Sequence, residues 1–359
     1  MSRSSHGRQT LVSIARDLGV SRATVSNAYN HPEQLSAQLR ERILARAAEL
    51  GYPGPDPAGR RLRGARVGAV GVLVDQGLSY AFADPAAALL LDGLAAELQL
   101  DGLGLLVHSG LANAAGLQHI RDASVDAWVV LSLPDFDPAV DAALVRGRPV
   151  IVFDQPALVG VPLIGIDDRA GAEMAARHLL YLGHRRFGVL TMPLLPDGRE
   201  GRADQERQDL TGYRIMRERL AGVRHTLRAA GLDWGDVVVM ECGSNDPDAG
   251  ARATTLLLAE RPGLTAVIAL SDQLALGALR AALELDMHVP DQLSVIGFDD
   301  APPAAHSFPP LTTIAQPLRE RGRAAGHQLR SVLNGESPDW PAPYPVRLVS
   351  RESTAPTWW

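Results

Sequence analysis

Short apolar runs alternate with helical segments from residue 67 onward, and this alternation constrains the fold more than any other feature of the sequence. Each run is long enough for one buried strand, and the segments between the runs repeat their apolar residues with a helical period. Examples are VGAVGVLV, DAWVVL and LSVIGF for strands and AGAEMAARHLLYLG for a helix. Strands that alternate with helices form a parallel sheet covered on both faces. Because about 290 residues are too many for one core, we predict two lobes with a cleft between them.

Polar side chains end the predicted strands. In open α/β sheets, ligands bind beyond the carboxyl ends of the strands, so these side chains indicate a ligand site in the cleft. The polar residues at the strand ends are Asp75, Ser109, Ser132, Asp154, Ser244, Ser271, Asp272, Asp299 and Asp300.

Residues 10–50 follow a different pattern, which predicts three short helices. The stretch TLVSIARDL carries one apolar stripe, and Gly19 separates it from a second segment, SRATVSNA. Each helix is preceded by a residue that favours the N-cap position, and these residues are Thr10, Ser21 and Ser36. Two short helices joined by a tight glycine turn and followed by a third helix are typical of a helix-turn-helix domain.

The second of these helices is rich in short hydrogen-bonding side chains. Val20 and Val25 are the main apolar residues of VSRATVSNAYN, and Val25 is expected to face inward. A helix that enters the major groove of DNA must present hydrogen-bonding groups to base edges and phosphates. Arg22 is long enough to reach guanine, and Asn27 suits adenine or a phosphate.

The charge distribution supports a polyanionic partner for the head alone. Eleven arginines and five acidic residues give residues 1–66 a formal charge of +6, whereas the whole chain carries −6, which leaves −12 for residues 67–359. A basic head on an acidic body favours binding of a nucleic acid through the head.

The sequence resembles the lactose-repressor-type (LacI/GalR) family of transcription regulators. The stretch TLVSIARDLGVSRATVSNAYNHPEQLSAQLRERILARAAELGY is similar to the head of that family, and SDQLALGALRAALELDMHVPDQLSVIGFDD, PPLTTIAQP and RESTAP follow in the order of its effector-domain motifs. The resemblance implies an α/β protein with a three-helix helix-turn-helix head, a hinge helix and a periplasmic-binding-protein-like body of two doubly wound parallel sheets. It also implies a homodimer that binds double-stranded operator DNA and a small-molecule effector.

The domain bounds that we expect are residues 1–54 for the helix-turn-helix head, 55–66 for the hinge and 67–359 for the body. Lobe 1 of the body is expected at about 67–163 and 316–335, and lobe 2 at about 164–315 and 336–359.

Ten residues are expected to contact DNA. They are Thr10, Ser21, Arg22, Ala23, Thr24, Ser26, Asn27, Asn30, Tyr52 and Leu62. By resemblance, Leu62 is the apolar wedge that the hinge helix inserts into the minor groove, which unstacks a base step; the alternative is that Leu62 docks the linker on the body. Gly59 departs from the family's usual alanine and should weaken an isolated hinge helix by roughly 1 kcal/mol.

Seven residues are expected to bind the effector. They are Asp75, Phe82, Asp154, Arg219, Ser271, Asp272 and Asp299. The resemblance implies the last four, and carboxylate and guanidinium groups suit a sugar or a nucleoside-like ligand. Two alternatives stay open: Asp299 caps a turn, and Asp272 is the N-cap of the helix that follows it.

Aromatic residues are few around the predicted cleft. Ala86 and Ala87 stand where the family often has a pair of aromatic residues, so Tyr80 or Phe82 would have to substitute. Trp128 is expected in the core rather than as a platform for the ligand.

Several classes of protein are disfavoured. The sequence has no P-loop, no glycine-rich dinucleotide motif after the first strand and no cluster of metal ligands, so we expect no enzyme, no metal and no cofactor. One cysteine, the lack of a signal peptide and apolar runs too short for a membrane fit a cytoplasmic protein. The alternative is a sugar- or nucleoside-binding protein of the periplasmic type without a role on DNA. Residues 196–211, PDGREGRADQERQDLT, are predicted to be a mobile polar surface loop, with partner binding as the alternative.

Overall fold

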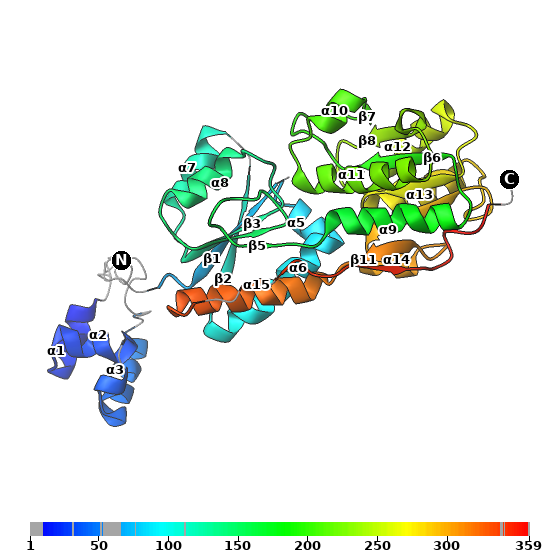
Figure 1. Cartoon of the computed structure of the whole chain (residues 1–359). Coiled ribbons are helices and arrows are strands. Elements are labelled where there is room, and N and C mark those ends of the chain that lie inside the picture. Colours follow the sequence, from blue (N-terminus) through cyan, green and yellow to red (C-terminus); the bar gives the residue numbers. More distant parts are fainter. Residues whose placement is uncertain are drawn as a thin grey trace, which may run out of the picture. The chain divides into compact units, whose positions relative to one another are not determined.

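The computed structural model describes residues 10–30, 32–50, 52, 66–75, 77–110, 113–337, 340 and 342–357. They belong to two compact units, Met1–Val67 and Gly68–Trp359 (Figure 1). Leu62 and the rest of the predicted hinge up to residue 65 lie outside the described residues.

The described residues of the first unit form three α-helices and one 3₁₀ turn. They are α1 (Leu11–Leu18), α2 (Arg22–Asn30), η1 (Pro32–Gln34) and α3 (Ala37–Glu49). Thr10 caps α1 through a reciprocal pair of hydrogen bonds with Ser13, and the side chain of Ser36 accepts a hydrogen bond from the first turn of α3. Gly19 ends α1 with a left-handed φ of 65°, a conformation that glycine adopts at no steric cost. The predicted helix-turn-helix and these N-caps are confirmed.

A small apolar core holds the three helices of the head together. Ile14 of α1, Val25 of α2 and Ile43 of α3 are completely buried and pack against one another. Val25 therefore faces inward as predicted, and it fixes the side of α2 that is left for solvent.

Lobe 1 of the second unit is built on a parallel five-stranded sheet. Its strands are β1 (Ala69–Val74), β2 (Gly104–Ser109), β3 (Ala127–Leu131), β4 (Val150–Phe153) and β5 (Leu163–Ile164), in the order β2-β1-β3-β4-β5. Its helical elements are α5 (Tyr80–Ala83), α6 (Pro85–Leu98), η2 (Gln99–Asp101), α7 (Ala114–Asp122), α8 (Pro138–Leu144) and α15 (Leu318–Leu333). Trp128 is 2% exposed and lies in the core, as predicted, because the neighbouring Gly71 leaves room for its ring.

Lobe 2 is built on a seven-stranded sheet. Its strands are β6 (Phe187–Thr191), β7 (Gly201–Arg202), β8 (Val238–Glu241), β9 (Ala266–Ala269), β10 (Ser294–Asp299), β11 (Thr312–Ala315) and β12 (Arg347–Val349), in the order β12-β11-β10-β9-β6-β8-β7. The edge strands β7 and β12 are antiparallel to their neighbours, and the other pairs are parallel. Its helical elements are α9 (Asp168–Tyr181), α10 (Gln205–Asp209), α11 (Arg214–Ala229), η3 (Trp234–Asp236), α12 (Pro247–Glu260), α13 (Asp272–Glu284) and α14 (Pro302–His306).

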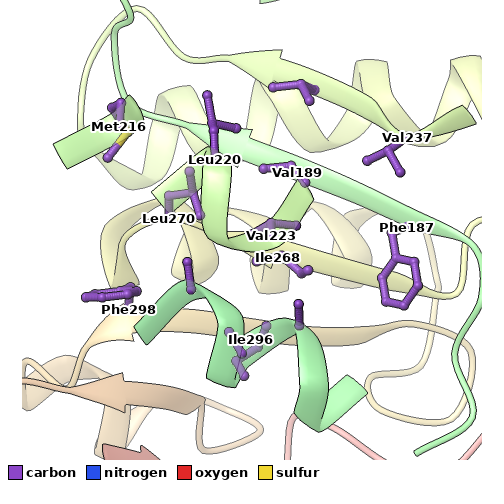
Figure 2. Close-up of a cluster of buried hydrophobic side chains, with 14 of the residues drawn as sticks. Phe187, Val189, Met216, Leu220, Val223, Val237, Ile268, Leu270, Ile296 and Phe298 are labelled. Carbon is purple, nitrogen blue, oxygen red and sulfur yellow. The ribbon is translucent and has the colours of Figure 1, made fainter. Parts of the chain in front are cut away.

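Helices cover both faces of the lobe 2 sheet. Figure 2 shows Met216, Leu220 and Val223 of α11 beside Val189 and Ile268 of the sheet. The spacing of these α11 residues puts them on one helical stripe, while α12 and α13 pack on the other face of the sheet. The predicted α/β fold with two parallel-sheet lobes is thus confirmed.

The chain crosses between the lobes three times. It leaves lobe 1 between β5 and α9, returns between β11 and α15, and enters lobe 2 again before β12 (Figure 1). Two-lobed bodies joined by short crossovers place the carboxyl ends of both sheets around one cleft.

Most of residues 196–211, the predicted mobile polar surface loop, are exposed, but the segment is not without secondary structure. The segment contains the edge strand β7 and the helix α10, and Arg207 within it is only 7% exposed. The charged side chains are ordered because they pair with one another and with Glu241, a partner far away in the sequence. Among the described residues, no helix is both long and apolar enough to cross a lipid bilayer.

Candidate nucleic-acid interface and ligand cleft

The exposed side of α2 carries the residues that the sequence predicts for base contacts. Arg22 and Ala23 are exposed, and Asn27 is half-buried. In the described part of the head nothing pairs with the guanidinium of Arg22, whereas the amide of Asn27 donates a hydrogen bond to Gln34 at 2.9 Å. Arg22 is therefore available for a ligand, whereas Asn27 would first have to break its hydrogen bond to Gln34.

The predicted backbone contacts surround this side of the helix. Ser21 and Thr24 join their hydroxyls at 2.8 Å, and Ser21 also accepts from the Thr24 amide, so both residues fix the first turn of α2. Thr10 is exposed at the start of α1, and Tyr52 is half-buried, with its ring against Tyr29. Ser26 is 7% exposed, which leaves little of it to contact DNA. Asn30 ends α2.

A buried charged cluster lies at the carboxyl end of β10 in lobe 2. Arg219 of α11 is 4% exposed and its guanidinium lies 3.7 Å from the centre of the Phe298 ring. It donates to Asp168 Oδ1 at 2.8 Å and to the Leu270 carbonyl oxygen at 2.6 Å, and its Nη1 is 3.9 Å from Asp299 Oδ1. The fold thus brings the predicted pair of Arg219 and Asp299 together with Asp168.

Burial controls the ionisation of this cluster. Burial raises the pKa of Asp299 well above its ordinary range, and Arg219 acts in the opposite direction. Burial also raises the pKa of Asp168, against the effect of Arg219, and the Oδ2 atom of Asp168 is buried without a hydrogen-bond partner among the described residues. A buried unpaired carboxylate oxygen is costly unless a donor reaches it, so the cluster is suited to a ligand that donates hydrogen bonds.

Asp168 was not predicted as a site residue. Its neighbour Asp167 is the N-cap of α9, with its side chain bonded to the Ala170 amide. Two aspartates before a helix are a common N-cap pattern, so only the ion pair with Arg219 shows that the second aspartate has another role.

The side chains of Ser271 and Asp272 already form hydrogen bonds within the protein, which the sequence does not indicate. Ser271 is the N-cap of α13, accepting from the Leu274 amide, and it donates to Asn245 Oδ1 at 2.6 Å. The alternative that Asp272 is the cap is therefore wrong.

The carboxylate of Asp272 is used inside the protein. One oxygen accepts from the Ala301 amide at 2.8 Å, and the other accepts from the Thr313 hydroxyl at 2.6 Å. Burial raises the pKa of Asp272 to about 7. These bonds tie α13 to the segments after β10 and in β11.

Asp75 and Asp154 come from lobe 1 at the ends of β1 and β4. Asp75 accepts a hydrogen bond from the Tyr213 hydroxyl of lobe 2 at 2.9 Å, and burial raises its pKa to about 6. Asp154 has a left-handed φ of 62° and forms an ion pair with Arg321. Arg321 is completely buried and also bonds to Gln316, whose amide donates to Asp299 Oδ1 at 2.6 Å. A chain of hydrogen bonds therefore connects Asp154 in one lobe with Asp299 in the other.

The two aromatic candidates differ in position. Phe82 is 73% exposed on α5, so its predicted role would require this short helix to move. Tyr80 lies beside Asp84 and Asn245, and burial raises the pKa of its hydroxyl well above the ordinary value. Asn245 also donates to Asp84 at 2.8 Å across the cleft. Of these two candidates, Tyr80 is the one that lies beside residues of both lobes.

No group of three or more metal-ligating side chains exists among the residues that the structure describes. The thiol of Cys242 is buried, and burial raises its pKa to about 12, which leaves it protonated and a poor nucleophile.

Comparisons with known proteins agree for both units. The family model described as "Bacterial regulatory proteins, lacI family" matches residues 10–54, and the one described as "Periplasmic binding protein-like domain" matches residues 176–354. An HTH-type transcriptional regulator of Mycobacterium tuberculosis is 43% identical over 333 residues, which is 92% of each chain.

Two solved structures are similar over nearly the whole chain. The lac repressor dimer bound to operator and the anti-inducer ONPF is 26% identical, with a TM-score of 0.77 over 97% of this chain and 99% of that one. The complex of the transcriptional regulator CelR with cellobiose is 29% identical, with a TM-score of 0.67 over 96% of this chain and 100% of that one.

Proposed function

The chain belongs to the LacI family of bacterial transcriptional regulators, and from this premise we propose that it is a repressor that binds a pseudo-palindromic operator as a homodimer and responds to a sugar or a sugar derivative. The general function follows from membership of the family: the chain is a DNA-binding transcriptional regulator with an effector-binding domain, and not an enzyme. A binding protein without a role on DNA is excluded by the family match of residues 10–54.

In this proposal α2 reads the operator. Arg22 contacts a guanine, while Ala23 and Asn27 adjust the base preference, since a long bidentate donor and a short amide read different base edges. Phosphates are contacted by Thr10, Ser21, Thr24, Asn30 and Tyr52, while the burial of Ser26 argues against its predicted contact. Leu62 is the minor-groove wedge. We keep residues 1–54, 55–66 and 67–359 as the head, the hinge and the body.

The observation that supports the effector class is the cluster of Arg219, Asp168 and Asp299. A guanidinium that donates in a fork, beside carboxyl groups whose oxygens accept hydrogen bonds, matches the vicinal hydroxyls of a sugar. Asp75, Asp154 and Ser271 extend this surface to both lobes, and Asp272 acts by holding the surrounding segments. The related CelR was solved with cellobiose, which supports the same class for this chain.

The regulatory step is a change in how the two lobes contact each other. A ligand alters DNA affinity only if it binds one arrangement of the lobes more tightly than the other. The coupling free energy in such systems is typically about 1–3 kcal/mol. The bonded chain from Asp154 through Arg321 and Gln316 to Asp299 gives the ligand a direct route to both lobes.

The first test is fluorescence anisotropy with the full-length protein and a labelled duplex from the DNA upstream of its own gene. A random duplex serves as competitor. We expect tight binding to the upstream duplex that the random duplex does not displace, and its loss when one member of a set of neutral sugars, including cellobiose and ribose, is added. Binding equal to that of random DNA would contradict the repressor proposal for this site, and tight binding that no sugar changes would contradict the proposed effector class.

A further inference from the structure

Residues 194–213, which we term the bridging segment, are fixed to lobe 2 by one buried arginine. Arg207 of α10 donates two hydrogen bonds to Glu241 of β8, both of 2.8 Å, and two to Asp197, of 2.6 and 2.7 Å. Glu241 is 1% exposed. The planar fork of an arginine side chain can serve two carboxylates at once, so Arg207 holds both the middle and the beginning of the segment against the sheet.

The two ends of the bridging segment are also tied to each other. The Leu194 amide donates to Glu241 Oε1 at 2.7 Å. The Leu194 carbonyl oxygen accepts from the Gly212 amide at 2.8 Å and from the Thr211 hydroxyl at 2.9 Å. Glu241 therefore accepts hydrogen bonds from both Arg207 and Leu194, and Leu194 in turn accepts one from Gly212. This chain of contacts links the position of Gly212 to Arg207.

The end of the bridging segment contacts lobe 1. The Asp135 amide, in the loop after β3, donates to the Gly212 carbonyl oxygen at 2.7 Å. The Tyr213 hydroxyl donates to Asp75 at 2.9 Å. Arg217 donates to Asp135 Oδ2 at 3.1 Å and to the Thr211 carbonyl oxygen at 3.0 Å. Residues 212–217 thus contact lobe 1 at two places, Asp75 and Asp135, through a backbone carbonyl, a hydroxyl and a guanidinium group.

We propose that the bridging segment is a clamp between the lobes and that Arg207 is its positioning residue, which holds Gly212 and Tyr213 against lobe 1. The clamp limits how far the lobes separate at the edge of the cleft that Asp75 lines. This inference goes beyond the proposed function, because it requires neither an operator nor an effector.

The Asp135 amide is a direct reporter of the clamp. Its hydrogen-bond acceptor lies in the other lobe, so its hydrogen exchange depends on separation of the lobes rather than on unfolding of either core. Hydrogen exchange of the full-length protein, measured by mass spectrometry on peptides that cover Asp135, follows this amide. Peptides from β3 and β6, which lie in the two cores, report on general loss of structure.

Arg207→Gln removes the positioning residue, and Arg202→Gln is the matched control. Arg202 belongs to the same segment, but it is more than half exposed and pairs with Glu260 within lobe 2. We expect Arg207→Gln to accelerate exchange at Asp135 by roughly tenfold or more while the core peptides stay at the wild-type rate. Arg202→Gln should exchange as the wild type does.

Two milder variants keep the test decisive if Arg207→Gln loosens the core of lobe 2. Tyr213→Phe removes only the hydroxyl that bonds to Asp75, and it should also accelerate exchange at Asp135. Arg207→Lys keeps one charge between Asp197 and Glu241 and should lie between the wild type and Arg207→Gln. Wild-type exchange at Asp135 in both Arg207→Gln and Tyr213→Phe, or acceleration in Arg202→Gln equal to that in Arg207→Gln, would overturn the clamp.

Discussion

At the scale of single residues, burial gives Asp75 an unusual dependence on pH. The carboxyl group faces the Tyr213 hydroxyl and the acidic Asp137, and burial raises its pKa to about 6. A pKa that is higher in the folded than in the unfolded protein means that the folded protein binds the proton more tightly. The contribution of Asp75 to stability is therefore complete below about pH 4 and is lost as the pH rises through about 6.

Replacement of Asp75 by asparagine tests the predicted loss of stability with rising pH. We expect Asp75→Asn to raise the free energy of unfolding at pH 7.5 by about 2–3 kcal/mol and to change it little at pH 4, because the amide resembles the protonated acid. Urea denaturation of both proteins between pH 4 and pH 8 measures the difference. A difference that does not vary with pH would show that the carboxyl group ionises normally in the folded protein.

Arg219 compensates two buried carboxylates, and its removal should be costly. Without the guanidinium, Asp168 and Asp299 are left without their cation, so we expect Arg219→Met to lower the free energy of unfolding by about 3–5 kcal/mol at pH 8. The loss should be smaller at pH 5, since burial already raises the pKa of both acids and they take up protons. Arg228→Met, on the exposed side of the same helix, is the control for urea denaturation and should change stability little. An equal loss for the two variants would argue against the buried cluster.

At the scale of helices and strands, the sequence predicts features that depend on neighbouring residues and misses elements that depend on contacts between distant residues. The N-caps Thr10 and Ser36 and the inward Val25 could be predicted because each depends on its own few neighbours. The strand β7 and the helix α10 could not, since their order depends on Arg207 meeting Glu241, 34 residues further along the chain. Strands of two to four residues such as β5, β7 and β12 are also too short to carry a periodic pattern.

The close crossing of α6 and α15 is another feature that the sequence did not reveal. A methyl group at Gly322 of α15 would overlap the Leu90 carbonyl oxygen of α6. Because a backbone atom cannot yield as a flexible side chain can, we expect Gly322→Ala to lower the free energy of unfolding by about 1–3 kcal/mol or more.

The control is Gly104→Ala, where the nearest atom to a new methyl group is 3.9 Å away. It should be neutral or slightly stabilising in the same thermal or urea denaturation, because alanine restricts the unfolded chain. Equal stability of Gly322→Ala and the wild type would mean that α6 and α15 lie further apart than the crossing requires.

At the scale of the whole molecule, the candidate ligand site is assembled from segments that are far apart in the chain. Arg219 and Asp299 were predicted because each occurs in a stretch that resembles the family. Asp168, Asn245 and Gln316 were not, because their roles arise only from contacts made after folding. The strand-end pattern predicts where polar groups gather, but it cannot say which of them are already satisfied inside the protein, as those of Asp272 are.

The uneven charge of the molecule leads to a prediction about salt. The head carries a formal charge of +6 and the remainder −12, so electrostatic attraction to DNA must come from the head. Binding should therefore weaken steeply as the salt concentration rises, because salt cations compete with the head for the phosphates. We expect Arg22→Ala to weaken binding to the upstream duplex by about 1–3 kcal/mol per base contact. Arg280→Ala removes an equal charge from lobe 2, where Arg280 pairs with Asp248, and should leave both the affinity and its salt dependence unchanged. Fluorescence anisotropy across a salt series measures both quantities, and equal effects of the two substitutions would mean that net charge, rather than the exposed side of α2, governs recognition.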